Sequence, residues 1–140
     1  MLDTDSLADL PWAIASLRIA SDTLSVDAIS DLVGLRHTTA RLAEGEPAFT
    51  VWMLESGLEP AAPIEDHLYV LVERLRGRSD EIRSLCDTAT VEVWLSFSPR
   101  TKQATSVLDH GVLAELGAFG VDLVLEPYPA SSQRPTRSGG

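Results

Sequence analysis

The chain has 140 residues, a hydrophobic share of 44%, a charged share of 23% and a formal net charge of -10. This size and composition indicate one soluble globular domain, and no apolar run approaches the roughly 18 residues that a membrane-spanning helix requires. The excess of 21 acidic over 11 basic residues disfavours nucleic-acid binding, because it repels phosphates, and suits a basic partner instead. Cys86 is the single cysteine, which excludes an internal disulfide and disfavours a zinc site.

Both ends of the chain are expected to lie outside the folded part. Residues 1–11 resemble a short polar lead without the basic and apolar regions of a signal peptide, so we expect a cytoplasmic protein. Residues 12–128 are expected to form a single domain. Residues 129–140 consist mainly of Ser, Pro, Arg and Gly, a composition that predicts a disordered tail.

The first strand is predicted at residues 12–20, where β-forming residues are frequent. In its second half, the apolar residues Leu17 and Ile19 alternate with the polar residues Ser16 and Arg18. A short helix follows, with Ser25 as its N-terminal cap and Gly34 as the left-handed residue at its end. The polar segment Gly34–Glu46 is interpreted as a connector, and residues 49–54 are predicted to form the second strand.

Two consecutive helices are predicted next. Pro63 suits the first position of the longer helix. Its apolar residues recur at helical spacing: Ile64, Leu68, Leu71, Val72 and Leu75. Gly77 interrupts this helix, and Ser79 can cap the second one.

The remaining part of the domain predicts a strand, a helix and a last strand. Residues 91–98 alternate clearly, with an apolar face and a face that is polar except for Trp94. Asp109 can cap a helix that ends at Gly117, and residues 121–126 supply the final strand. The order β-α-β-α-α-β-α-β predicts an α+β two-layer sandwich, in which a mostly antiparallel sheet of about four strands carries helices on one face.

Glycines, core positions and one tryptophan along residues 12–128 form a pattern that resembles a known family. The features are the first strand, the helix that ends at Gly34, the Gly45-Glu46 pair, Trp52, the two-helix block and Leu113–Gly117 leading to Asp122 and Tyr128. They resemble the bacterial family catalogued as domain of unknown function 4279. His37 stands where that family usually has a proline, which removes a constraint on the turn. The resemblance implies a fold and no catalytic residues.

Trp94 suggests a protein-binding surface, because a large aromatic side chain on the polar side of a strand can anchor a partner. Four polar residues are predicted to share its face: Glu92, Ser96, Asp122 and Glu126. An acidic surface around an aromatic residue suits a basic protein. We therefore expect a non-catalytic binding module, with masking of a basic toxin, an immunity or antitoxin-like role, as one concrete form. Packing of Trp94 under the N-terminal arm or a loop is the alternative.

A second hypothesis places a small anionic ligand, as a sensor or minor enzyme, on the connector. Arginine forks and hydroxyl groups recognise phosphates and carboxylates, and the candidate residues are Arg36, His37, Thr38 and Arg41. The segment matches no phosphate-loop pattern, so a structural loop is the competing interpretation.

Neither a metal site nor a catalytic centre is predicted. The three histidines do not form a pair with ligand spacing, and His67 is interpreted as a boundary residue beside an apolar stripe. Cys86 shares a helical stripe with Ile82 and Leu85, which indicates a small buried residue rather than a nucleophile. We expect no cofactor and no enzymatic activity, whereas an exposed sheet face or edge permits a homo-oligomer.

Overall fold

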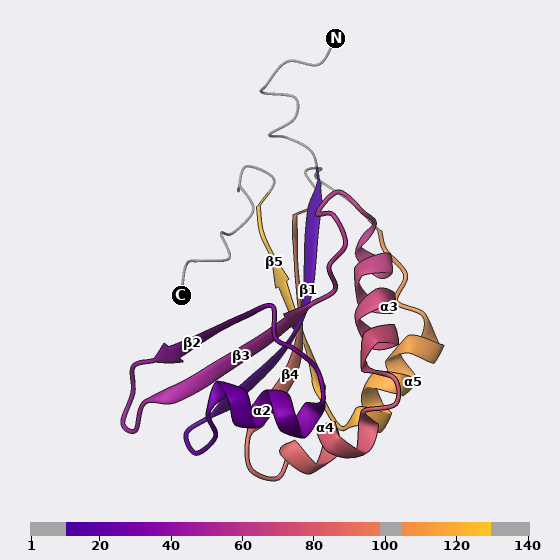
Figure 1. The fold of residues 1–140 in the computed structure, drawn as a ribbon. Coiled ribbons are helices and arrows are strands. Elements are labelled where there is room, and N and C mark those ends of the chain that lie inside the picture. Colours follow the sequence, from indigo (N-terminus) through magenta and orange to yellow (C-terminus); the bar gives the residue numbers. More distant parts are fainter. Residues whose placement is uncertain (1–10, 99–104, 130–140) are drawn as a thin grey trace.

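The computed structural model describes residues 11–98 and 105–129, which form one sheet covered by helices (Figure 1). All but the first residue of the predicted tail at 129–140, and all but the last residue of the predicted lead at 1–11, lie outside the described residues. The strands are β1 (Trp12–Ser21), β2 (Thr39–Ala43), β3 (Phe49–Glu55), β4 (Thr90–Ser98) and β5 (Asp122–Pro127). The described helices are α2 (Val26–Val33), α3 (Ile64–Leu75), α4 (Ser79–Leu85) and α5 (His110–Phe119).

The sheet has the strand order β2-β3-β1-β4-β5. The central strand β1 pairs antiparallel with both β3 and β4, and β2 pairs antiparallel with β3. Only β4 and β5 are parallel, because the chain between them crosses over through α5. The predicted α+β fold with a mostly antiparallel sheet is therefore confirmed.

The hydrophobic core lies between the sheet and the helices. Alternate residues of the three central strands point towards the helices and are fully buried: Leu17, Ile19, Trp52, Leu54, Val93 and Leu95. They meet the apolar stripe of α3 and the buried residues of the other described helices. Each large apolar side chain buried in this way contributes about 1.5–3 kcal/mol to stability, so this layer supplies most of the driving force for folding.

The first helix begins and ends where its sequence indicates. The Oγ of Ser25 accepts a hydrogen bond from the Ala28 amide at 3.2 Å and caps α2. Gly34 follows the helix with a φ of 76°, a conformation that favours glycine. A Cβ at Gly34 would lie 2.8 Å from the Nη1 of Arg78, but this is the flexible end of a side chain that can move, so the left-handed turn is the reason for glycine at this position.

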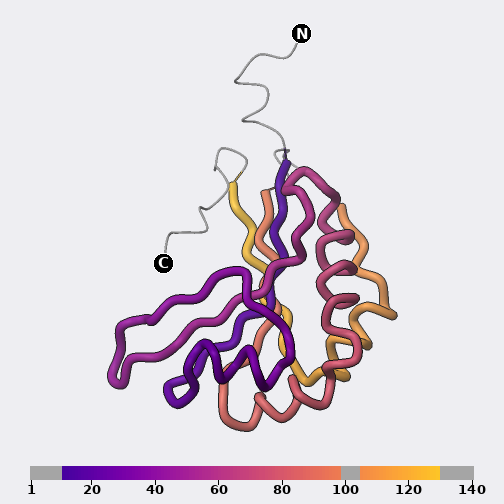
Figure 2. The backbone as a smooth tube through the Cα atoms, in the orientation of Figure 1, coloured from indigo at the N-terminus to yellow at the C-terminus, as the bar shows by residue number. Residues whose placement is uncertain are grey.

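The connector contains an unpredicted strand. Residues 39–43 form β2, which pairs with β3 to make a hairpin at the edge of the sheet (Figure 2). Its pattern is weak because an edge strand has one partner and few buried residues, and only Ala43 is buried. The sheet thus has five strands instead of about four.

Three predicted helix ends differ from the structure by one to three residues. Pro63 precedes α3 instead of beginning it, and Ser79 is the first residue of α4 while Arg78 occupies the cap position without a side-chain cap. The last helix does not end at Gly117 but continues to Phe119, because Phe119 buries its ring and Gly120 adopts the left-handed conformation. Asp109 caps this helix as predicted, accepting from the Gly111 amide at 3.0 Å.

No helix among the described residues has both the length and the apolar character that crossing a membrane requires. The longest of them, α3, has 12 residues.

Candidate functional site

The sheet face opposite the helices, here called the open face, carries the polar residues of the strands. The register places Glu92 of β4 opposite Asp122 of β5, and Ser96 opposite Glu126. Trp94 lies between these two rows on the same face. The sheet therefore brings together the five side chains predicted for partner binding.

Hydrogen bonds order two of these acidic side chains. The indole Nε1 of Trp94 donates to the Glu92 carboxylate at 3.2 Å, and the Ser96 hydroxyl donates to the Glu126 carboxylate at 2.7 Å. Trp94, Glu92 and Glu126 are half-buried, whereas Asp122 is exposed. The carboxylates of Glu92, Asp122 and Glu126 on β4 and β5 form what we call the acidic half of the open face.

Arg18 lies against the ring of Trp94, with its Cζ 4.1 Å from the ring centroid. Burial lowers the pKa of the Arg18 guanidinium, and the charge of Arg41 lowers it further, while the Glu126 and Glu92 carboxylates raise it. Arg18 of β1 and Arg41 of β2 form the basic half of the open face. Sequence reasoning missed Arg18 as a site residue, although the alternation of its strand placed it on the polar side.

An aromatic pair lies at one end of the open face, next to the acidic half. The rings of Trp12 and Tyr128 lie 5.2 Å apart between centroids. Trp12 is only 6% exposed, although its strand position places it on the open face. Burial raises the pKa of Tyr128, and the neighbouring Glu126 carboxylate raises it further. Aromatic side chains thus extend from Trp94 to this end of the sheet.

The four residues of the predicted ligand site do not share one face. The ring of His37 meets the ring of Trp52 on the helix side, with centroids 6.5 Å apart. Arg41 pairs with Val51, and Val51 pairs with Ala20. Ala20 is two residues after Arg18 on β1 and so lies on the same face, which places Arg41 on the open face. The Thr38 hydroxyl accepts a hydrogen bond from the Glu55 amide at 3.0 Å, and Arg36 is exposed. Only Arg41 therefore joins the open face.

A buried serine and histidine pair was not predicted. The Oγ of Ser56 lies 3.1 Å from the Nδ1 of His67, and His67 is 1% exposed, so it is not the boundary residue expected from the sequence. Burial lowers the pKa of His67, although the surrounding carbonyls of Glu59 and Ala62 raise it. The adjoining cavity of about 40 Å³ has room for about one water molecule. The pair joins the end of β3 to the first turn of α3.

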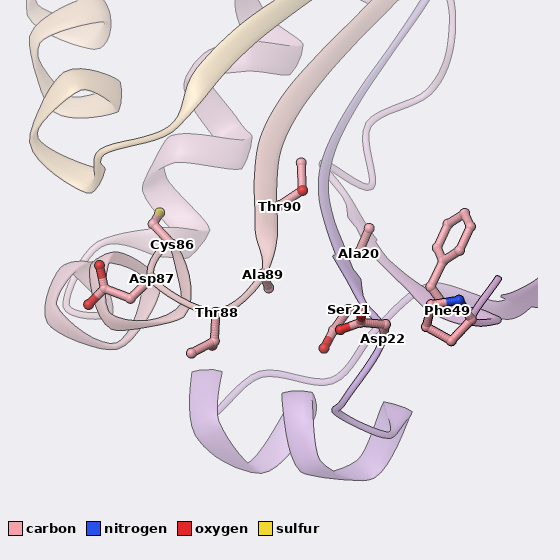
Figure 3. A pocket seen from close by; sticks show the side chains of 10 residues that line it. Ala20, Ser21, Asp22, Phe49, Cys86, Asp87, Thr88, Ala89 and Thr90 are labelled. Atoms are coloured by element: carbon pink, nitrogen blue, oxygen red, sulfur yellow. The ribbon is translucent and has the colours of Figure 1, made fainter. Parts of the chain in front are cut away.

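A wider, open depression of about 540 Å³ lies at the ends of β1 and β4 (Figure 3). Among the described residues that line it, the ionisable side chains besides Cys86 are the exposed aspartates Asp22 and Asp87, which do not suit an anion. Cys86 is half-buried, and burial raises the pKa of its thiol, with Asp87 and Asp122 adding to this effect. A raised pKa makes the thiolate scarce and the side chain a poor nucleophile. None of the predicted site residues lines this depression.

Within residues 11–98 and 105–129, no three metal-ligating side chains come together in a way that could hold an ion.

Comparisons with known proteins give one result. No curated protein and no solved structure matches the chain. A family model, described as domain of unknown function (DUF4279), matches residues 11–130, which include every described strand and helix. The chain therefore belongs to the DUF4279 family, as the pattern of its glycines, core positions and Trp52 predicts.

Proposed function

We propose that the protein is a non-catalytic binding module that engages a basic partner protein through the open face of its sheet. The observation that supports this most directly is the position of Trp94, half-buried on the open face and flanked by the three carboxylates of the acidic half. Tryptophan residues often supply much of the binding energy at protein interfaces, particularly when polar groups surround them.

The rigidity of the site favours this role. Trp94 is held between the guanidinium of Arg18 and a hydrogen bond to Glu92, and Glu126 is held by Ser96. Side chains that are already ordered lose little conformational entropy on binding. All of them project from a sheet whose other face is packed against the core, so the site rests on a rigid element.

Charge favours a basic partner. The molecule carries a net charge of -10, and the acidic half concentrates three carboxylates beside one aromatic anchor. Such a field accelerates association with a positively charged protein and weakens as salt is added. A basic toxin held in an inactive complex is the concrete form that we propose for this partner.

Capture of partners from the native host, followed by affinity measurement with the purified partner, tests the proposal. Trp94→Ala should weaken binding by at least about tenfold, as expected for a central aromatic anchor. Glu126→Gln should weaken it less, and more strongly at low salt than at high salt. The matched control is Tyr69→Ala, because Tyr69 is an exposed aromatic residue on α3, in the helix layer.

The proposal is wrong if Trp94→Ala binds the partner as tightly as the wild type while Tyr69→Ala does not. It is also wrong if affinity rises with salt, since attraction between opposite charges must weaken when ions screen it. The alternative, a small-ligand sensor or minor enzyme based on the connector, would instead show loss of ligand binding in Arg36→Ala with Trp94 intact.

A further inference from the structure

Arg18 is a half-buried arginine whose acidic neighbours on the open face, Glu92 opposite it in the register and Glu126, form no salt bridge with it. It forms no salt bridge with any described residue, and its Nε is buried without a hydrogen-bond partner there. Removing a cation from water without pairing it is unfavourable. A bound anion at this position would therefore be stabilised by a charge that the fold has already partly desolvated.

The two carboxylates that act most on the charge of Arg18, those of Glu126 and Glu92, form hydrogen bonds with other side chains. Glu126 accepts from Ser96, and Glu92 accepts from the Trp94 indole. Their charges raise the pKa of Arg18 from a distance, but neither forms a salt bridge with it. Because the Cζ of Arg18 lies over the ring of Trp94 and its Nε is buried, the terminal N–H groups of the guanidinium are the part that a ligand would approach.

A second buried polar atom without a hydrogen-bond partner lies in the row of the sheet that contains Arg18. The Oγ1 of Thr39 is buried and has no hydrogen-bond partner among the described residues. Thr39 pairs with Met53, and Met53 pairs with Arg18, so all three side chains belong to the open face. Buried polar atoms without a partner are rare in folded proteins and often mark a position where water or a ligand binds.

Arg41 adds a second positive charge to this region. It is exposed on the edge strand β2, and its charge lowers the pKa of Arg18, so the two cations interact. The strand β3 separates β2 from β1, so the two cations are not a direct cross-strand pair, and an anion bound between them would reduce the repulsion of their like charges. Glu55 of β3 faces the same side but is not among the charges that shift the pKa of Arg18.

We propose that Arg18, Arg41 and Thr39 form a binding site for a small monocarboxylate with an apolar body. The planar fork of Arg18 matches a carboxylate through two parallel hydrogen bonds, and Arg41 supplies further attraction. The apolar body lies over Met53, between the two buried polar atoms. A phosphate dianion fits less well, because the nearby Glu92 and Glu126 repel two charges more than one.

This site goes beyond the proposed function, because it uses the basic half of the open face and requires no partner protein. It is tested with the full chain and 3-phenylpropionate as the probe. Two NMR signals report binding, the side-chain Nε–H of Arg18 and the indole N–H of Trp94, the latter assigned with Trp94→Phe. Both signals should shift in a saturable way with 3-phenylpropionate and not with its neutral amide.

Three variants locate the site. Arg18→Gln should raise the dissociation constant by about tenfold or more, because it removes the fork. Arg41→Gln, on the exposed edge, should raise it by about two- to fivefold without disturbing the fold. Arg36→Gln removes another exposed arginine, which lies outside the strands of the sheet, and should leave the dissociation constant unchanged.

Equal shifts with the acid and the amide would overturn the proposal, and so would tighter binding of inorganic phosphate than of 3-phenylpropionate. An Arg41→Gln variant that binds like the wild type would also overturn the assignment of the basic half. Arg18 also contacts Trp94, so the two proposals are separated with the other variants. Arg41→Gln should weaken binding of 3-phenylpropionate and leave the basic partner bound, whereas Glu126→Gln should weaken binding of the partner and not that of 3-phenylpropionate. Loss of one activity with retention of the other therefore identifies which proposal has failed.

Discussion

The two faces of the sheet are built from alternate residues of the same strands, yet they differ in almost every physical property. Leu17 and Ile19 of β1 are fully buried under the helices, whereas Arg18 between them lies on the open face against Trp94. The helix face is apolar and contributes stability through burial. The open face orders its arginine, acids and tryptophan through specific contacts. Stability and recognition thus occupy opposite sides of one sheet.

The largest effect expected from this comparison is on the helix face. Trp52→Ala should lower the free energy of unfolding by about 3–5 kcal/mol, because Trp52 is 0% exposed and its removal leaves a cavity. The variant also loses the hydrogen bond from the indole Nε1 to Ser30, which is 2.9 Å long in the structure. Urea denaturation measures the loss, and a change below about 1 kcal/mol would contradict the assignment of Trp52 to the core.

The same substitution on the open face should cost less. Trp94→Ala removes a half-buried ring and its contact with Arg18, and a cation–π contact of this kind contributes about 0.5–1 kcal/mol. We expect a loss of about 1–2 kcal/mol in the same denaturation experiment, well below that of Trp52→Ala. If the two variants were equally destabilised, the open face would have to be treated as a second core.

His67 gives the helix side a dependence on pH. Its pKa in the folded protein is lowered by burial, so the unfolded chain binds the proton more tightly. Neutral His67 therefore stabilises the folded protein fully above about pH 6.5, the ordinary pKa of histidine. This stabilisation is lost as the pH falls through the lowered pKa of the folded state. Urea midpoints at pH 7.5 and 5.5 should differ more in the wild type than in His67→Gln. Equal differences would show that His67 does not titrate with unfolding.

The smallest effect is expected from an ion pair within the helix layer. Arg76 and Glu115 form two hydrogen bonds, at 2.9 and 2.8 Å, and this pairing lowers the pKa of Glu115. Both side chains are partly exposed, so water and salt screen the interaction. Glu115→Gln should shift the urea midpoint only slightly at low salt and not at all at high salt. A shift that persists at high salt would mean that the side chain contributes through packing.

Local signals predicted the fold well where one residue type dictates a conformation. Ser25 and Asp109 cap their helices, and Gly34 ends the first of them, because short side chains that bond to the backbone and residues without a Cβ act within a few positions. β2 was missed because an edge strand with one buried residue lacks the alternation that burial imposes. The end of α5 was placed too early because burial of Phe119 outweighs the helix-breaking tendency of Gly117.

The sequence by itself determined the fold class, the family and which side chains of each strand share a face, because alternation acts within a single strand. The pairing of β4 with β5, which brings Glu92, Asp122 and Glu126 to the same face, was decided by the tertiary structure. Only the tertiary structure decided that Arg18 lies against Trp94, that Ser56 meets His67, and that His37 and Arg41 lie on opposite sides of the sheet. These contacts depend on strand register and helix docking, which follow from packing of the whole core rather than from any local segment.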